Sequence, residues 1–275
     1  MKFWKYQGIG NDFIVLDGTE GNLFIDNNWC KKVCDRHYGI GADGVLYILP
    51  GENTDLTMRI INADGSEAEM CGNGIRCVAK HAYDFGLIKK EEFFIHTLAG
   101  DLKAKVKTNN RKVTTVQIDM GAPILDGRKI PIDHDGEFVN QSFDVDGIRI
   151  KANAVSMGNP HFITFTDLSE KEIDRLGPII ECNPFFPHKT NVEFCRIENK
   201  KIYIRVYERG AAWTLACGTG ACATTTVAAL NGLVPLGEPV DVHLPGGWLK
   251  ITVDKDLKYV LMEGPAELVF EGNIN

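Results

Sequence analysis

The sequence predicts a mixed fold of the α+β type, in which two pseudo-symmetric domains each wrap a curved, mostly antiparallel sheet around one central helix. Three observations support this prediction. The chain has 275 residues, enough for two domains of ordinary size. The stretch Met58–Lys80 returns in altered form as Ile204–Thr226. Most of the remaining segments alternate apolar and polar residues, as half-buried strands do.

The internal repeat aligns without a gap and places Cys71 over Cys217 and Arg59 over Arg205. A second match lies upstream in each copy, where Gly-Asn-Asp-Phe at 10–13 resembles Gly-Asn-Pro-His-Phe at 158–162. Two matches in the same order indicate a duplication. We therefore divide the chain into an N-terminal half, residues 1–120, and a C-terminal half, residues 121–275. The last strand of the chain could return to the N-terminal half.

Each half is expected to contain a strand (57–62 and 202–207), a polar loop, a Cys-Gly-x-Gly segment and then a helix. The first helix should span 73–85 and end at Gly86, and the second 219–230, ending at Asn231-Gly232. The second helix carries no charge, so it should be buried on all sides. A further helix is predicted over 27–38. Further strands are expected at 13–17, 45–49, 93–97, 102–107, 113–119, 148–155, 161–166, 240–244, 248–253, 258–263 and 266–270.

Composition excludes some classes of function. The formal net charge of −7 argues against a nucleic-acid partner, which would demand clustered basic residues. We find no apolar run long enough for a membrane span and no secretory signal. The expected location is therefore the cytoplasm, with no membrane partner, and the eight cysteines should be reduced thiols rather than disulfides.

Two other motifs have structural explanations. The glycines of residues 39–44 fit the dinucleotide pattern G-x-G-x-x-G, but a helix precedes them and a strand follows, which is the wrong order for such a site. Cys77 and His81 have helical spacing that could share a metal ion, yet no second pair lies nearby in the sequence. We predict a glycine-rich turn, buried core side chains and no metal site.

Cys71 and Cys217 are the candidate catalytic residues. Each sits where a helix is expected to begin, and unpaired N–H groups at such a position favour a thiolate and attract an anion. An amino-acid α-hydrogen is a very weak acid, so its removal needs stabilisation of the carboxylate as it becomes enediolate-like. Inversion then needs a base on one face of the carbon and an acid on the other. A thiolate and a thiol facing each other across a domain cleft could exchange these roles.

Other polar residues occur in the repeated elements or near them. His161 and Glu208 could exchange protons with the thiols, although a half-buried histidine and a surface ion pair of Glu208 with Arg209 explain them equally well. Four asparagines lie on loops expected to face the cleft, where turn formation is their default role: Asn11, Asn62, Asn159 and Asn191.

These residues resemble a known family, the diaminopimelate epimerases, essentially from end to end. The resemblance rests on the segments GIGNDFIVLDG, GIGADG, NADGSEAEMCGNGIRC, GNPHF, TNVEF and YERGAAWTLACGTGACA. It implies cofactor-independent conversion of LL-diaminopimelate to meso-diaminopimelate, in lysine and peptidoglycan precursor biosynthesis. It also implies a cytoplasmic homodimer with a small-molecule substrate.

Residue roles follow from the same resemblance. Cys71 and Cys217 are the two acid/base residues, and His161 and Glu208 tune their protonation. Gly72-Asn73 and Gly218-Thr219 hold the reacting carboxylate. The rest of the substrate is held by Asn11, Asn62, Asn159, Asn191, Glu208 and Arg209.

Two positions depart from the family pattern. Some members have a substrate-contacting glutamine where this chain has Gly44, and many read Gly-Glu where Ala212-Trp213 stand here. Trp213 could cover the cleft loop or pack on a neighbour. The alternatives are a related two-cysteine racemase acting on proline or hydroxyproline, and a non-catalytic thiol redox or metal-binding protein. The fold alone would not fix the chemistry, because a fold hosts several functions.

Overall fold

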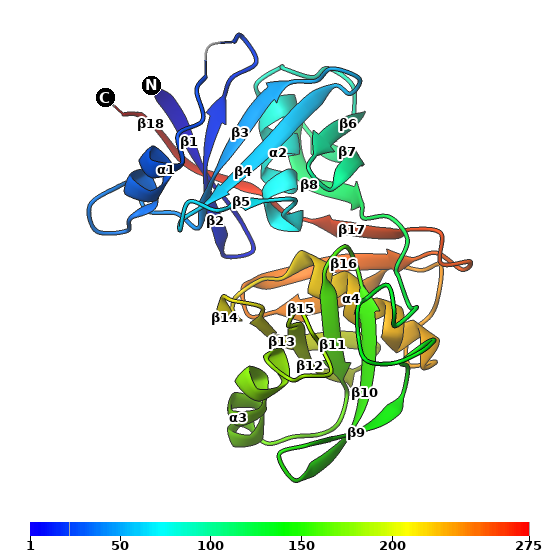
Figure 1. Ribbon diagram of the computed structural model, residues 1–275. Helices are drawn as coiled ribbons and strands as arrows, with labels where there is room; N and C mark the ends of the chain where they lie inside the picture. Colours follow the sequence, from blue (N-terminus) through cyan, green and yellow to red (C-terminus); the bar gives the residue numbers. More distant parts are fainter. Residues whose placement is uncertain (22, 275) are drawn as a thin grey trace. The chain divides into compact units, whose positions relative to one another are not determined.

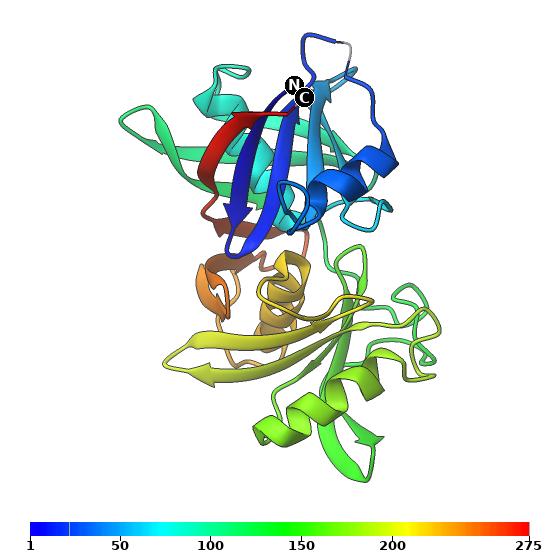
Figure 2. The same cartoon turned by 90° about the vertical axis from the view of Figure 1, so that its left-hand side faces the viewer.

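The computed structural model describes residues 1–21 and 23–274 (Figure 1). The chain divides into two compact units. Unit 1 comprises Met1–Asp119 and Glu263–Asn275, and unit 2 comprises Met120–Met262. The C-terminal segment therefore belongs with the N-terminal part of the chain, and the two termini meet where the Met1 amino group donates to the Ile274 carbonyl at 2.5 Å (Figure 2).

Unit 1 is a curved sheet with a helix inside it (Figure 1). Neighbouring strands pair antiparallel except β2 with β3 and β4 with β6, which are parallel. The elements are β1 (Lys2–Gly8), β2 (Asn11–Asp17), α1 (Asn27–Cys34), β3 (Gly44–Pro50), β4 (Leu56–Asn62), β5 (Glu67–Ala68), α2 (Gly72–Asp84), β6 (Glu92–Thr97), β7 (Gly100–Asn109), β8 (Lys112–Asp119) and β18 (Glu267–Asn273).

Helix α2 contacts strands β1, β2, β3, β4, β7 and β8, so the sheet surrounds it. Its buried side chains include Ile75, Val78 and Ala82, which form the face expected of a central helix. Helix α1 lies against β3 and β4, where Cys30 and Val33 pack on a separate cluster with Val45 and Ile61.

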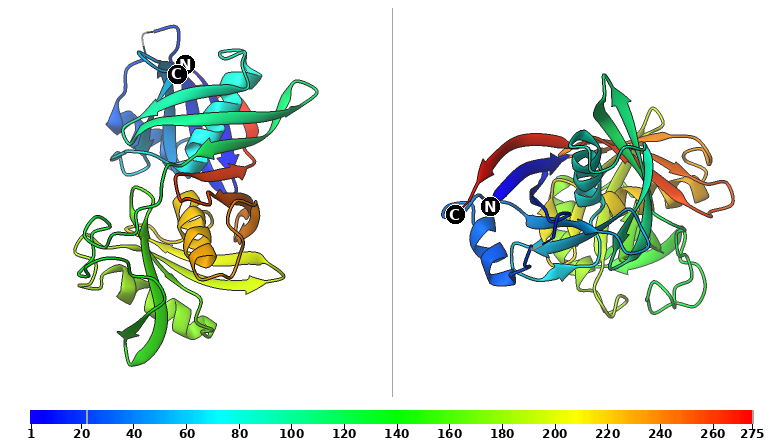
Figure 3. Two further views of the ribbon diagram at one scale, coloured as in Figure 1. Left: turned by 90° about the vertical axis from the view of Figure 1, so that its right-hand side faces the viewer. Right: turned by 90° about the horizontal axis from the view of Figure 1, so that it is seen from above.

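Unit 2 repeats this arrangement (Figure 3). Its strands again pair antiparallel, except β11 with β12 and β13 with β15, which are parallel. The elements are β9 (Gln141–Val145), β10 (Ile148–Ser156), β11 (Pro160–Thr164), α3 (Glu170–Glu181), β12 (Asn191–Glu198), β13 (Lys201–Glu208), β14 (Ala212–Thr214), α4 (Gly218–Leu230), β15 (Val240–Leu244) and β16 (Gly247–Val253). The boundary between the units falls within β17 (Val260–Gly264), after Met262.

The two units match element by element. Helix α4 takes the place of α2 and contacts β10, β11, β12, β13, β15 and β16. As predicted, this uncharged helix is buried on all sides, from Gly218 to Ala229. Helices α1 and α3 each follow the second of two antiparallel strands and precede the parallel third strand. The predicted fold class is confirmed.

Two local predictions were wrong. The helix expected over 27–38 ends at Cys34, because the Asp35 carboxylate accepts from the amides of His37 and Tyr38 and closes a turn there. Helix α3 was not predicted at all, since Pro178 inside it is atypical of a helix. Its N-terminus is fixed by a capping box between Ser169 and Glu172. No described helix is long and apolar enough to span a membrane.

Candidate functional site

Cys71 is the N-cap of α2, as the sequence predicts. Its backbone is extended (φ −140°, ψ 117°), and its Sγ accepts a hydrogen bond from the Gly74 amide at 3.4 Å. The residue is partly buried. A thiol at this position can serve the first turn as a capping acceptor, and the helix N-terminus beside it favours negative charge.

Asn11 and Asn73 lie beside this thiol. The Cys71 Sγ is 3.6 Å from Asn11 Oδ1, and Asn73 Nδ2 donates to the same oxygen at 3.2 Å. Asn73 is almost fully buried, and its own Oδ1 accepts from Arg76 Nη2 at 3.0 Å. The structure thus brings together three residues that the sequence assigned to one half of the site.

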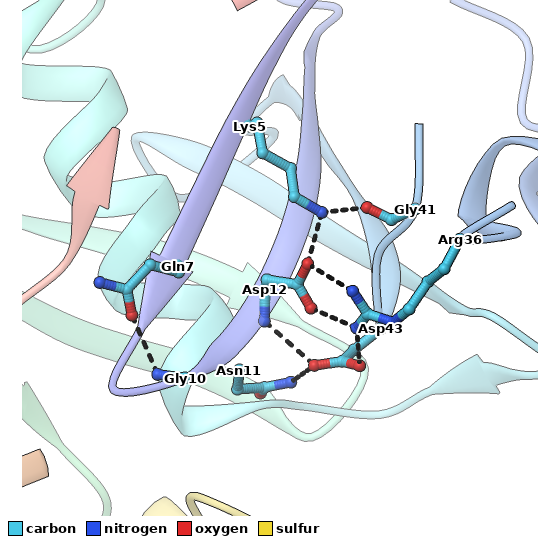
Figure 4. A network of polar contacts seen from close by, with 8 residues as sticks. All are labelled: Lys5, Gln7, Gly10, Asn11, Asp12, Arg36, Gly41 and Asp43. Carbon is cyan, nitrogen blue, oxygen red and sulfur yellow. Dashed lines mark hydrogen bonds and ion pairs between the residues drawn. The ribbon is translucent and has the colours of Figure 1, made fainter. Parts of the chain in front are cut away.

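A charged network holds Asn11 from the other side (Figure 4). Asp43 Oδ2 accepts from Asn11 Nδ2 at 2.7 Å, and Asp43 Oδ1 accepts from Arg36 at 2.8 Å. Arg36 also binds both carboxylate oxygens of Asp12 (2.6 and 3.1 Å), and the buried Lys5 ammonium contacts Asp12 at 2.5 Å. These charges hold the pKa of Asp12 down, at about 2, despite its burial. The sequence analysis did not foresee this network.

Asn62 is a less constrained member of the proposed set. It lies at the end of β4, where its Nδ2 donates to Ser66 Oγ at 3.0 Å and its amide donates to the Ser66 carbonyl at 2.8 Å. This is the turn-forming role expected by default. These two bonds use its Nδ2 and its backbone amide, so its Oδ1 is available to a ligand.

Cys217 is the N-cap of α4 and matches Cys71 in geometry. Its backbone is extended (φ −128°, ψ 106°), and its Sγ accepts from the Gly220 amide at 3.3 Å and lies 3.5 Å from Thr219 Oγ1. It is more deeply buried than Cys71. Burial raises the pKa of this thiol well above its ordinary value, and the negative charges of Glu208 and Glu193 raise it further.

Glu208 is a partly buried carboxylate that forms a hydrogen bond with the Cys217 thiol. Burial raises its pKa, while hydrogen bonds from Thr214 and Cys217 act in the opposite direction. A thiol that donates a hydrogen bond to a carboxylate can pass its proton to it. Glu208 thus lies partly buried beside Cys217 and forms a hydrogen bond with this thiol, rather than a surface ion pair with Arg209.

His161 is fully buried and held at both ring nitrogens. Its Nδ1 lies 2.7 Å from Glu193 Oε1 and its Nε2 lies 3.0 Å from Asn159 Oδ1. Glu193 is also fully buried, and within the described residues its Oε2 has no hydrogen-bond partner. The sequence analysis missed Glu193. The available signal was one carboxylate among apolar neighbours, in a segment whose two faces are both buried.

Unit 1 has an apolar pair at the positions that match His161 and Glu193. In unit 1 the position of His161 is taken by Phe13, which is the first partner of β3 as His161 is of β12. Leu46 takes the position of Glu193: a Cβ added to Gly74 would meet Leu46 at 3.1 Å, and one added to the matching Gly220 would meet Glu193 Oε1 at 2.6 Å. The same architecture accepts two apolar side chains.

Asn191 and Arg209 are linked through the backbone. Asn191 Oδ1 accepts from the Arg209 amide at 3.0 Å, and its Nδ2 donates to the Pro160 carbonyl at 2.9 Å. The buried Asn191 therefore fixes the loop that follows β13. The exposed Arg209 guanidinium donates from Nη1 to the His188 carbonyl at 3.3 Å, and the other donors of its planar fork are available to a ligand.

The two departures from the family pattern have structural explanations. A Cβ at Gly44 would stand 2.9 Å from the Ile61 carbonyl oxygen, so the backbone is too close here for a larger residue without a shift. Trp213 packs on its neighbours: its ring centroid lies 5.1 Å from that of Tyr207, and the Arg205 guanidinium lies 4.5 Å above it.

None of the eight cysteines forms a disulfide in the described structure. Across residues 1–21 and 23–274, no three His, Cys, Asp or Glu side chains are grouped to hold a metal ion.

Solved structures with a similar fold come from several enzymes. A probable proline racemase from Agrobacterium radiobacter K84 has a TM-score of 0.73 at 13% identity, covering 100% of this chain and 92% of that one. A PhzF-family phenazine biosynthesis protein from Bacillus anthracis has a TM-score of 0.72 at 16% identity, covering 100% and 99%. At these identities the likeness shows the fold alone.

Sequence comparison is more specific. The model of the family described as "Diaminopimelate epimerase" matches residues 3–125 and 153–269. The diaminopimelate epimerase of Carboxydothermus hydrogenoformans is 47% identical over 99% of this chain and 98% of its own length. That of Desulfitobacterium hafniense is 44% identical over 99% and 97%. This chain therefore belongs to the diaminopimelate epimerase family.

Proposed function

We propose that the chain converts LL-diaminopimelate to meso-diaminopimelate, with Cys71 and Cys217 as the two acid/base residues and without a cofactor. The observation that carries the proposal is the matched pair of helix N-caps, one in each unit, both of which are cysteines. A fold alone does not require cysteine at an N-cap, where Ser, Thr, Asp and Asn are the usual residues.

The reaction begins when one thiolate removes the α-proton and its sulfur becomes a thiol. The electron pair moves into the adjacent carboxylate, which becomes enediolate-like. The other thiol then donates its proton to the opposite face of the same carbon and is left as the thiolate. The configuration inverts, one proton is taken and one is given, and the reverse reaction exchanges the two roles.

The helix N-termini supply the stabilisation that this step needs. Gly72-Asn73 and Gly218-Thr219 begin α2 and α4, and their backbone N–H groups belong to the set without a partner inside the helix. Donors fixed in this way can bind the reacting carboxylate and take up charge as it develops, without reorganising.

Proton partners and substrate contacts complete the proposal. Glu208 exchanges a proton with Cys217, and His161, oriented by Glu193, serves as the second tuning residue. The ammonium groups and the distal carboxylate of the substrate would be held by Asn11, Asn62, Asn159, Asn191, Glu208 and Arg209.

Further expectations rest on the family. We propose a role in lysine and peptidoglycan precursor biosynthesis, in the cytoplasm, with no nucleic-acid or membrane partner. We also propose a homodimer. Strand β18 supports it, because it exposes apolar side chains on both of its faces, Leu268 and Phe270 on one and Val269 on the other, which a second copy could cover. Light scattering of the purified protein measures its mass directly.

The central test is an assay of LL-diaminopimelate with the purified protein, with no pyridoxal phosphate added and with a metal chelator present. Formation of meso-diaminopimelate, followed by chiral chromatography, is the expected result. Activity that required pyridoxal phosphate or a metal ion would contradict the mechanism, and absence of activity under all conditions would contradict the substrate.

A further inference from the structure

The Asn11 side chain has an orientation that its neighbours fix from both ends. Its Nδ2 lies 2.7 Å from Asp43 Oδ2, and a carboxylate can only accept, so this end must be the NH₂ group. At the other end, Asn73 Oδ1 accepts from Arg76, a pure donor. Asn73 therefore presents its NH₂ to Asn11, and the Asn11 atom that receives it must be the carbonyl oxygen.

This carbonyl oxygen is the atom that faces Cys71, with Sγ and Oδ1 3.6 Å apart. Since an amide oxygen has no proton, the hydrogen bond exists only if the sulfur carries one. The Gly74 amide donates to the same sulfur at 3.4 Å, so a thiol can both donate and accept here. A thiolate in this place would point its charge at the negative end of the amide dipole.

Asp43 is itself held in place. Its carboxylate accepts from Arg36 at 2.8 Å, from the Asp12 amide at 3.0 Å and from Asn11 (Figure 4). The matching asparagine of unit 2, Asn159, directs its Oδ1 to His161 Nε2 at 3.0 Å. The arrangement is therefore specific to unit 1 and is not a requirement of the duplicated fold.

We propose that Asp43 is a positioning residue for the reaction: by fixing the Asn11 amide it holds Cys71 as the thiol in the substrate-free enzyme. The inference rests on the proposed function only in taking Cys71 as an acid/base residue. Asp43 acts on the sulfur through Asn11, which bonds to both of them. Charged or titratable groups in the network and its surroundings are Lys5 on β1, Asp12 on β2, Arg36 and Asp43 before β3, and Arg76 and Cys77 on α2.

The test is alkylation of Cys71 by iodoacetamide in substrate-free protein at neutral pH, with the modified peptide quantified by mass spectrometry. Only the thiolate reacts, so the rate reports the thiolate fraction. Asp43→Asn replaces the charged acceptor of Asn11 by an amide that can donate as well as accept, so only Asn73 still favours the native orientation of the Asn11 amide. The expected result is alkylation about three- to tenfold faster than in the native protein. This is the change in thiolate fraction that corresponds to the free energy of one hydrogen bond.

Asp12→Asn is the matched control. It removes the same charge from the same Arg36 network but leaves the acceptor of Asn11 in place, so Cys71 should react at the native rate. At a pH high enough to ionise the thiol fully, the native protein and both variants should react at the same rate. This comparison distinguishes a change in thiol ionisation from a change in the access of iodoacetamide to the sulfur. An unchanged rate in Asp43→Asn, or equal acceleration in both variants, would overturn the proposal.

A double-mutant cycle separates action through Asn11 from any other effect of Asp43. Asn11→Ala removes the acceptor directly and should accelerate alkylation as Asp43→Asn does, and it supplies the test if the aspartate variant does not fold. In the Asn11→Ala background, Asp43→Asn should add nothing. Full additivity would refute the proposal. These measurements need no substrate, so their outcome is independent of the outcome of the epimerase assay.

Discussion

Glu193 Oε1 lies 2.7 Å from His161 Nδ1, and neither side chain is exposed to solvent. The corresponding residues of unit 1 are Leu46 and Phe13. Burying a carboxylate costs free energy unless it is well paired, and one oxygen of Glu193 has no partner among the described residues. Since unit 1 has an apolar pair at the matching positions, the cost of burying this polar pair supports the role in the reaction proposed for His161.

Replacing this pair should therefore separate stability from activity. Glu193→Ala leaves His161 buried without its partner and should lower the free energy of unfolding by about 3–5 kcal/mol. The double variant His161→Phe, Glu193→Leu copies the packing of unit 1 and should recover most of that loss. Epimerisation should be absent in the double variant. Urea denaturation and the epimerase assay measure the two effects.

Glu193→Gln keeps the shape and an acceptor for the imidazole and is the matched control for stability. It should unfold near the native urea concentration while kcat falls and KM changes little. A double variant less stable than Glu193→Ala would show that the two units do not pack alike at this site. Native kcat in Glu193→Gln would show that the charge of Glu193 does not serve His161.

Each cysteine should be indispensable. Cys71→Ala and Cys217→Ala remove the acid/base group from one face of the carbon, and inversion needs both faces. Neither variant should form meso-diaminopimelate at a measurable rate, and serine variants should retain little activity because an alcohol is a far poorer acid. Cys195→Ala, at another buried cysteine of unit 2, is the control and should remain active. Near-native turnover in either catalytic alanine variant would exclude a two-cysteine mechanism.

The sequence predicted the central elements and His161 and Glu208, but not the carboxylates that hold the site residues, Glu193 and Asp43. Cys71 and Cys217 were placed at helix starts because the repeat, the glycines and the helical pattern agree, and both are N-caps. Glu193 was missed because a strand buried on both faces has no alternation to show where a side chain points. Asp43 was read only as part of a glycine-rich turn, since its partner Asn11 lies on another strand.

The buried thiol of Cys217 should make the protein less stable at alkaline pH. The pKa of this group is raised well above 9.0 in the folded chain, first by burial and then by Glu208 and Glu193. Above the pKa of an unfolded thiol, the unfolded chain releases the proton and the folded chain keeps it. The free energy of unfolding then falls with rising pH, by about 1.4 kcal/mol per pH unit for this one group, until the folded pKa is reached. Below that window the contribution is constant.

Cys217→Ser isolates this effect. Cys34, Cys77 and Cys195 also have raised pKa values and remain in both proteins, so they cancel in the comparison. Urea denaturation across the alkaline range should give a steeper fall for the native protein than for the variant. Parallel curves would show that Cys217 ionises as readily in the folded chain as in the unfolded one.

Substrate choice should depend on Arg209. Diaminopimelate differs from simpler amino acids in its second amino-acid end, and a planar guanidinium can bind the distal carboxylate through two charge-assisted hydrogen bonds. The Arg209 backbone is fixed by Asn191 while its side chain is exposed. Arg209→Lys keeps the charge but not the fork, so kcat/KM for diaminopimelate should fall about tenfold or more, the cost of one hydrogen bond to a charged group.

The matched measurement uses substrates rather than variants. Lysine lacks the distal carboxylate and proline lacks the whole distal end, so both should react poorly with the native protein. Neither should become much worse in Arg209→Lys, because neither has the group that Arg209 is proposed to bind. Lysine and proline turning over as fast as diaminopimelate would show that the distal end is not recognised and would favour a racemase of broader specificity. An equal loss of kcat/KM on all substrates in Arg209→Lys would instead assign the arginine to the end that reacts.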